Sequence, residues 1–302
     1  MHVRIFFQWI AVTIVIIVTV SFFGSVIASQ VVRYSGFRLA MAANGQDAFV
    51  GKNFQVSIGN SQLMDGLSAD QINMERRDVR FLNLAFNGLY SPDLVAVMET
   101  FYKSCGCTVD RLYVNVGALE DETPGTSEVQ VFMSAFNKDL RPQIYPDDSS
   151  RRFSLSILPL LRFNNEVFLR SAYFWFIGHD DQGHGNVYRL RIPKVSPNRY
   201  GGAQKKAFID FPRLERLVEI TRINRTKLIL VVPPFHPLYV ENRAGFAEYV
   251  SQVRADLHRF NLPILDHSAG IVAEYDGYAD LIHLNLEGQK TYSRYFAERV
   301  IP

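Results

Sequence analysis

The chain has 302 residues, of which 48% are hydrophobic and 21% are charged, and its formal net charge is +2. A chain of this length and apolar content can bury a large core, as one domain or as two smaller ones. The balanced charge argues against nucleic acid as a partner, and no P-loop or strand-linked G-x-G-x-x-G motif points to a nucleotide.

An uncharged apolar run opens the chain, from Ile5 to Val32. About 20 such residues span the hydrocarbon core of a bilayer as a helix, and the apolar region of a signal peptide is shorter. We therefore expect residues 1–32 to be a membrane anchor. A signal cleaved after Ala28 and a buried helix of a soluble domain are the alternatives.

Two opposing arguments bear on the orientation of this segment in the membrane. More Lys and Arg residues follow the run than precede it, which favours a cytoplasmic domain. However, the leading tail is very short, and large domains are exported largely regardless of their charge. We therefore expect a single-pass protein whose domain is extracytoplasmic, in the periplasm or at the cell surface.

After a connector at residues 33–52, short apolar runs alternate with amphipathic stretches. Strands are predicted at residues 54–58, 79–85, 111–117, 227–232 and 262–265, and helices at 91–103, 245–260 and 286–300. Strands that alternate with helices predict an α/β domain of three layers, with a mainly parallel, flavodoxin-like sheet. Such sheets carry their sites at the carboxyl ends of the strands.

Residues 118–225 interrupt this alternation. Two helices are predicted there, at residues 152–176 and 208–223, with a loop rich in Gly, Asp and His at 178–186 and a basic stretch that continues to Lys206. We interpret this region as an insertion that caps the site, because long insertions often form binding loops or lids. His179 and His184 could hold a metal or line a substrate channel, but a solvated loop is favoured.

The chain contains two cysteines, Cys105 and Cys107, separated by one glycine. The pair supplies too few ligands for a structural zinc site, and a bridge between residues so close in sequence would be strained. We expect two packed thiols, with a labile redox pair as the alternative. On this interpretation the cysteines do not define the cellular compartment.

Two short segments carry residues suited to nucleophilic catalysis. Ser61 follows a predicted strand and the turn Gly59-Asn60, a position that exposes a hydroxyl above the edge of a sheet. A serine needs an adjacent base to act as a nucleophile. Near the carboxyl terminus, Asp280 precedes His283 by three residues, so its carboxylate can orient the imidazole. Taken singly, each segment is also explained as a helix cap or a surface turn.

Together, three segments resemble the blocks of the SGNH (GDSL-like) hydrolase superfamily: residues 59–66, 83–88 and 280–288. The resemblance covers residues 53–118 and 226–300 and implies one SGNH-like domain, residues 53–302, with the insertion at 118–225. It implies a triad of Ser61, His283 and Asp280, and an oxyanion hole formed by the backbone N–H groups of Ser61 and Gly88. Asn60, Asn87 and His236 would contact substrate, and no metal or organic cofactor is implied.

Within the superfamily, a membrane segment combined with these blocks is similar to proteins that act on bacterial surface polymers. This implies a serine esterase or O-acyltransferase whose substrate is an acylated cell-envelope polysaccharide or a related ester. The alternative is an inactive SGNH-type module that binds glycan or docks a membrane-bound acyltransferase. The chain departs from the family's third block, because Leu119 stands where an asparagine usually donates to the oxyanion. Loss of one such donor can lower the rate by about 10²–10³.

Overall fold

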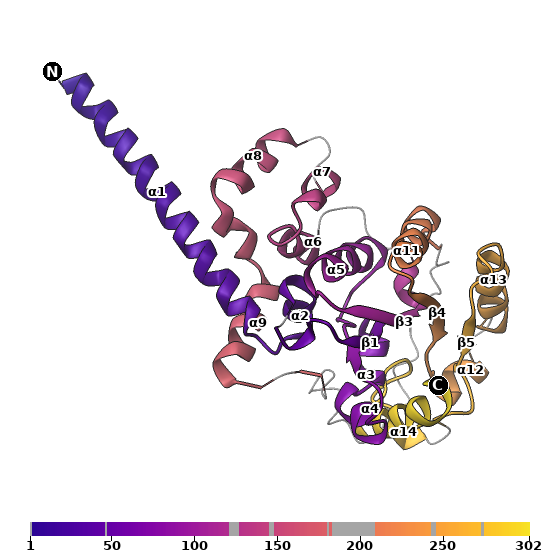
Figure 1. Ribbon diagram of the computed structural model, residues 1–302. Helices are drawn as coiled ribbons and strands as arrows, with labels where there is room; N and C mark the ends of the chain where they lie inside the picture. Colours follow the sequence, from indigo (N-terminus) through magenta and orange to yellow (C-terminus); the bar gives the residue numbers. More distant parts are fainter. Residues whose placement is uncertain are drawn as a thin grey trace.

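The computed structural model describes residues 2–45, 47–120, 127–144, 148–179, 181–182, 209–242, 246–272 and 275–302. At its centre is a sheet of five parallel strands in the order β2-β1-β3-β4-β5 (Figure 1). The strands are β1 (Asn53–Ile58), β2 (Phe81–Asn83), β3 (Thr108–Asn115), β4 (Lys227–Val232) and β5 (Ile264–Asp266). The predicted α/β class and parallel sheet are therefore confirmed, and the strand order is the one found in flavodoxin-like sheets.

Helices cover both faces of this sheet. Alternate residues of a strand point to opposite faces, so Leu112 and Val114 lie in one core cluster and Tyr113 in the other. The first cluster contains side chains of α2 (Arg38–Asn44), α5 (Ser91–Ser104), α11 (Phe211–Ile223) and α13 (Phe246–His258). The second contains side chains of α3 (Ser61–Gly66), α4 (Ala69–Glu75) and α14 (Leu286–Tyr295). Burial on both faces explains why β4 reads as a nearly continuous apolar run.

The remaining described elements are short, apart from the first helix. They are η1 (Asp47–Phe49), η2 (Val116–Leu119), α6 (Glu128–Met133), η3 (Lys138–Leu140), α7 (Arg141–Ile144), α8 (Ser149–Ile157), η4 (Pro159–Phe163), α9 (Glu166–Ile177), α12 (Pro237–Asn242), η5 (Tyr275–Gly277) and η6 (Phe296–Val300). Most of them lie at the edges of the sheet or in the predicted insertion.

The first helix, α1 (His2–Arg33), projects away from the domain (Figure 1). Its stretch Phe7–Arg33 is long and apolar enough to cross a membrane. The carboxyl-terminal turns of the same helix pack on the domain, because Ser21, Ala28 and Val32 are buried. Most of α1 is therefore an exposed apolar helix, whereas its carboxyl-terminal turns are packed as part of the domain.

Residues 33–52, expected to be a connector, instead contribute α2 to the core. Arg38 is 1% exposed, and its Nε lies 2.8 Å from Oδ2 of Asp181, which is also buried. The guanidinium also donates to the carbonyl oxygens of Asp181 and Ala85. A buried charge is tolerated when it is paired and hydrogen-bonded in this way. The segment could not be recognised as core from its composition, since the partner of Arg38 lies far away in sequence.

The predicted helix at residues 152–176 is broken in the structure into α8, η4 and α9. Pro159 has no N–H to donate, and the residue before it, Leu158, adopts a non-helical conformation. A new helix then begins where the side chain of Asn165 accepts the N–H of Phe168. Of these elements, α9 packs against α1 and α2, η4 packs against α1, and α8 packs against η4, while the neighbouring α6 packs against α5.

The loop at residues 178–186 is described only in part, since Asp180 and residues 183–208, including His184, lie outside the described residues. The expectation of a solvated loop is wrong for two of its members, because Asp181 and Gln182 are buried. Gln182 covers the free edge of β2. Its Oε1 accepts the N–H of Asn83 at 2.8 Å, and its Nε2 donates to the Asn83 carbonyl at 3.3 Å.

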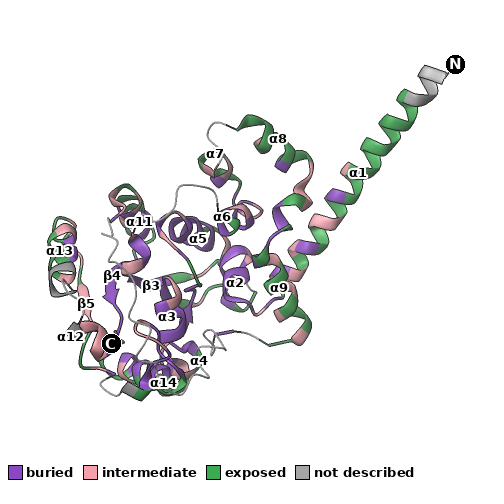
Figure 2. Ribbon diagram, turned by 180° about the vertical axis from the view of Figure 1, so that it is seen from behind, coloured by how far each residue is buried: buried purple, intermediate pink, exposed green. Residues whose placement is uncertain are grey.

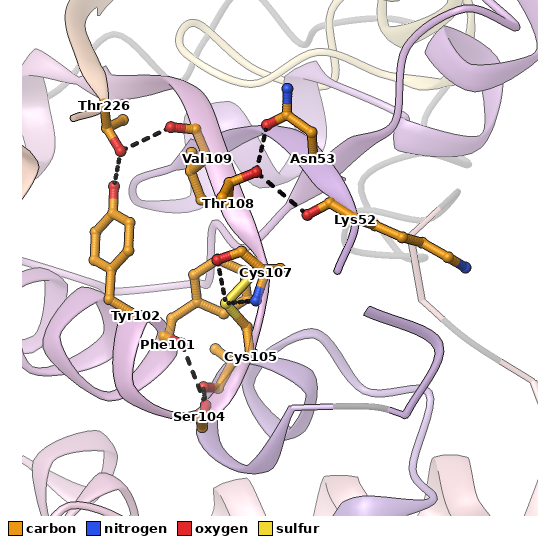
Figure 3. Close-up of a disulfide and its surroundings, with 11 residues drawn as sticks. Lys52, Asn53, Phe101, Tyr102, Ser104, Cys105, Cys107, Thr108, Val109 and Thr226 are labelled. Atoms are coloured by element: carbon orange, nitrogen blue, oxygen red, sulfur yellow. Dashed lines mark hydrogen bonds between the residues drawn. A yellow bond between two sulfur atoms is a disulfide. The ribbon is translucent and has the colours of Figure 1, made fainter. Parts of the chain in front are cut away.

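Cys105 and Cys107 form a disulfide, so the expectation of two thiols is wrong (Figure 3). Gly106 between them has a φ of 57°, a left-handed conformation that glycine adopts without a steric penalty. The bridge joins the end of α5 to the beginning of β3. It therefore lies at the amino end of the strand, opposite the edge on which the predicted site was expected.

Candidate active site

Ser61 lies at the carboxyl edge of the sheet, as the first residue of α3. The strand β1 ends at Ile58, and Asn60 caps the helix by accepting the N–H of Gln62 on its Oδ1 at 3.1 Å. Gly59 allows this turn to lie against the end of β3, since a Cβ there would stand 2.5 Å from the Cβ of Asn115. The backbone N–H of Ser61 is one of the first four of a helix, which have no partner within the helix and point outward along its axis.

A compact turn before α14 carries Asp280 and His283. The Oδ1 of Asp280 accepts the backbone N–H groups of Ile282 and His283, both at 2.9 Å. Asn285 then caps α14 by accepting the N–H groups of Glu287 and Gly288. The turn is therefore fixed on both sides of His283, by the carboxylate before it and by the helix cap after it.

The two segments meet, and three side chains form a continuous hydrogen-bonded chain. Ser61 Oγ lies 2.8 Å from His283 Nε2, and His283 Nδ1 lies 2.8 Å from Asp280 Oδ2, although Ser61 and His283 are 222 residues apart. A general base must lie within hydrogen-bond reach, about 2.6–3.2 Å, of the oxygen whose proton it removes, and the distance between Ser61 Oγ and His283 Nε2 meets this requirement. A carboxylate only accepts hydrogen bonds, so Nδ1 carries the proton and Nε2 is left to accept from Ser61.

The surroundings keep Asp280 ionised. Burial by itself would raise the pKa of this carboxyl group, but hydrogen bonds from the His283 ring and from the N–H groups of Ile282 and His283 stabilise the carboxylate, so the pKa lies below its usual value. His283 is 8% exposed, which limits the access of water to the imidazole. An ionised carboxylate beside a shielded imidazole stabilises the imidazolium that forms when a serine is deprotonated.

The loop that carries Gly88 is tied to the turn that carries Ser61. The N–H of Phe86 donates to the carbonyl of Gly59 at 2.9 Å, which joins the two loops just beyond the sheet. Gly88 has a φ of 71°, and both Gly88 and Asn87 are exposed. The structure thus places Gly88 on the same edge of the sheet as Ser61, on the neighbouring strand.

The third strand supplies a different asparagine from the one that the family pattern leads us to expect. Leu119 is 1% exposed and packs in the core, so it offers nothing to a substrate. Asn115, fully buried, donates from Nδ2 to Asn60 Oδ1 at 2.7 Å and accepts the N–H of Gly117 on its Oδ1, also at 2.7 Å. Asn115 therefore holds the turn that bears Ser61. Sequence reasoning missed it, although an asparagine that ends an apolar strand was a visible signal.

Two of the predicted substrate contacts have structural roles here. Asn60 is the cap of α3 and the partner of Asn115. His236 is 1% exposed, accepts the N–H of Leu238 on Nδ1, and donates its backbone N–H to the carbonyl of Leu281. This backbone hydrogen bond to Leu281 helps to hold the turn that carries Asp280 and His283. A contact of either residue with substrate stays a prediction.

Asn83, at the end of β2, is the second positioning residue that sequence reasoning did not single out. Its Nδ2 donates to the carbonyls of Leu63 and Leu67, and its Oδ1 accepts the N–H of Ala85. It therefore joins α3 to the strand that leads to Gly88. His267 is buried, and its Nδ1 lies 2.9 Å from the hydroxyl of Tyr292.

Neither protein-family models nor curated proteins match this chain. The resemblance to the SGNH superfamily therefore stays a prediction from three short sequence blocks.

Proposed function

We propose that this chain is a member of the SGNH superfamily and a serine-dependent esterase or O-acyltransferase. The observation that carries the proposal is the contact of 2.8 Å between Ser61 Oγ and His283 Nε2, with Asp280 on the far side of the ring. The three-layer, flavodoxin-like arrangement and the position of the site at the carboxyl ends of β1 and β2 support it. The substrate is an acylated cell-envelope polysaccharide or a related ester.

The proposed reaction passes through an acyl-serine. The Ser61 oxygen attacks the ester carbonyl while His283 Nε2 takes the hydroxyl proton, and Asp280 stabilises the resulting imidazolium. The backbone N–H groups of Ser61 and Gly88 would donate to the oxyanion of the tetrahedral intermediate. Collapse of this intermediate breaks the ester bond, and His283 gives its proton to the departing alcohol. A water molecule or an acceptor hydroxyl then attacks the acyl-serine, which yields hydrolysis or transfer.

An extracytoplasmic position for the domain is part of the proposal. The disulfide between Cys105 and Cys107 supports it, because disulfides persist in oxidising compartments and are rare in the cytosol. The apolar stretch Phe7–Arg33 supplies the membrane attachment. The excess of Lys and Arg residues after this helix favours instead a cytoplasmic domain.

A second candidate is an inactive module that binds glycan or docks a membrane-bound acyltransferase. It is favoured by one observation, the burial of Leu119 at the place where the family has an oxyanion donor. With two backbone donors instead of three, the enzyme would be slow by about 10²–10³ or would have lost turnover.

The two candidates differ in what the loss of the Ser61 hydroxyl does. The purified full-length protein is assayed for hydrolysis of an activated acetyl ester and of an acetylated polysaccharide, with wild type, Ser61→Ala and Ser154→Ala compared. Ser154 is the matched control, since its hydroxyl is exposed on α8 and bonds only its own helix. The esterase proposal predicts turnover that Ser61→Ala abolishes and Ser154→Ala leaves intact. Glycan binding without turnover in wild type would favour the inactive module.

A further inference from the structure

Large apolar side chains that are exposed to solvent gather on one part of the described surface. Outside α1, most of them belong to α8, η4 and α9, of which Phe176 is 83% exposed and Leu169 67%. We call six of these side chains the apolar collar: Phe153, Leu161, Leu169, Tyr173, Trp175 and Phe176. A large exposed apolar patch marks a surface that contacts another molecule or a membrane.

The helix α9 shows why this exposure is not incidental. One face of the helix is packed, with Val167 and Ser171 buried against the domain. The opposite face carries Leu169, Tyr173 and Phe176 at the spacing i, i+4 and i+7, and all three are exposed. The exposed ion pair of Glu166 and Arg170 lies next to these side chains, so the outer side of α9 is amphipathic, as in helices that contact the interface of a bilayer.

The collar is attached to the membrane helix. In Figures 1 and 2, α9 lies beside the point at which α1 leaves the domain, and α8 lies farther from that point and packs against η4, which contacts α1. The backbone N–H of Leu160 in η4 donates to Ser21 Oγ of α1 at 3.2 Å. Ser35 Oγ, just beyond α1, donates to the carbonyl of Ser171 in α9 at 2.8 Å. The position of the collar relative to the bilayer is therefore set by α1.

The length of the apolar run in α1 indicates the depth at which the collar lies relative to the bilayer. A helix of about 20 residues crosses the hydrocarbon core, so a span that begins at Ile5 ends near Gly24. Gly24 is the residue of α1 that faces Leu160, since a Cβ there would lie 3.0 Å from Leu160 Cδ2. The element η4 thus lies where the hydrocarbon core gives way to the headgroups. Tryptophan and tyrosine are the side chains that concentrate at this level.

We propose that the apolar collar lies in the interfacial zone of the lipid leaflet from which α1 emerges. Phe153 and Leu161 lie nearest the boundary between acyl chains and headgroups, because η4 contacts Ser21 and Gly24 of α1. Tyr173, Trp175 and Phe176 lie farther out, among the headgroups, because Ser171 of the same helix contacts Ser35 beyond the end of α1. Arg151 and Arg152, next to Phe153, supply positive charge to lipid phosphates. The domain is then held against the bilayer by α1 and by the collar together, which fixes its orientation on the membrane. This inference does not depend on the proposed chemistry.

The two tryptophans of the chain make the test direct. Full-length protein with Trp9→Phe retains Trp175 as its sole tryptophan and is reconstituted, at high lipid excess, in phosphatidylcholine–phosphatidylglycerol vesicles that contain brominated lipid. Bromine quenches a tryptophan only at close range. We expect Trp175 to lose at least about half of its emission, as an aromatic side chain inside the interfacial zone should.

Two further single-tryptophan proteins, both carrying Trp9→Phe and Trp175→Phe, complete the design. Phe153→Trp reports on α8 and should be quenched like Trp175. Met74→Trp is the control, because Met74 is 76% exposed on α4, remote from the collar. Circular dichroism verifies that each protein is folded. Quenching of Trp175 or of Phe153→Trp no greater than that of Met74→Trp would overturn the proposal. This result is also the one expected if a second copy or another protein covers the collar, because neither is available in these vesicles.

Discussion

Replacement of Asp280 by asparagine isolates the contribution of the carboxylate to the proposed triad. The amide side chain retains an oxygen that can accept the N–H groups of Ile282 and His283, so the turn should stay folded. What is lost is the negative charge 2.8 Å from His283 Nδ1. Two unit charges about 4 Å apart at an effective dielectric constant of about 40 attract by about 2 kcal/mol, which is about 30-fold in rate. The high dielectric constant reflects the 31% exposure of the Asp280 side chain.

A second effect adds to this loss. The amide nitrogen of asparagine would face Nδ1 and donate to it, which favours the tautomer with its proton on Nε2. That tautomer cannot accept the proton of Ser61, and in a comparable triad the same change lowers turnover about 10⁴-fold. For Asp280→Asn we expect a fall in kcat of about 10²–10³, between the electrostatic loss alone and the full effect.

The assay is hydrolysis of an activated acetyl ester, with the melting temperature measured in parallel. Asp276→Asn is the matched control, since Asp276 is exposed, lies in the same segment, and undergoes the same change of charge. The control should keep the wild-type rate. A folded Asp280→Asn protein with the rate of the control would refute the assignment of Asp280 and leave at most a Ser61–His283 pair.

Three further predictions concern the scaffold. Arg38→Met removes the guanidinium that pairs with the buried Asp181 carboxylate and should destabilise the protein by about 3–5 kcal/mol. Arg33→Met breaks an exposed pair with Asp47 and should have a much smaller effect; equal effects in denaturant unfolding would contradict the burial argument. Gly59→Ala places a Cβ within 2.5 Å of the Cβ of Asn115. It should lower the free energy of unfolding by about 1–3 kcal/mol and displace Ser61. Unchanged stability and turnover would show that the turn can relax. Burial lowers the pKa of His267 from 6.5 to about 4, so the unfolded chain takes up a proton first as the pH falls. The free energy of unfolding should therefore fall by about 3 kcal/mol between pH 6.5 and pH 4, and this part of the loss should be missing in His267→Gln; identical pH profiles would argue against a neutral buried imidazole.

The parts of the fold and of the site that could be predicted from the sequence are those that depend on residues close together in the chain. The apolar run Lys227–Val232 and the turn residues after Ile58 determine strands and their ends without reference to the rest of the chain. Asp280 and His283 are close because they are close in sequence. Their meeting with Ser61 followed from the order of the blocks and from the rule that parallel strands share a carboxyl edge.

The parts that were not predictable depend on contacts between distant residues. Nothing near Arg38 indicates a buried charge, because its partner Asp181 follows 143 residues later. The roles of Asn83 and Asn115 likewise depend on which loops are neighbours at the edge of the sheet. Pro159 is a different case, since a proline inside a predicted helix was a local signal of the break that the structure contains.

The central claim is that Ser61 carries the acyl group during turnover, and one measurement addresses it directly. The full-length protein is mixed with an activated acetyl ester, quenched in acid within one turnover, digested, and mapped by mass spectrometry. We predict one acetyl group on the peptide that contains Ser61, and its loss in His283→Ala, because the serine then has no base. Ester hydrolysis that proceeds with no acetyl group on Ser61, at an unchanged rate in Ser61→Ala, would contradict the account.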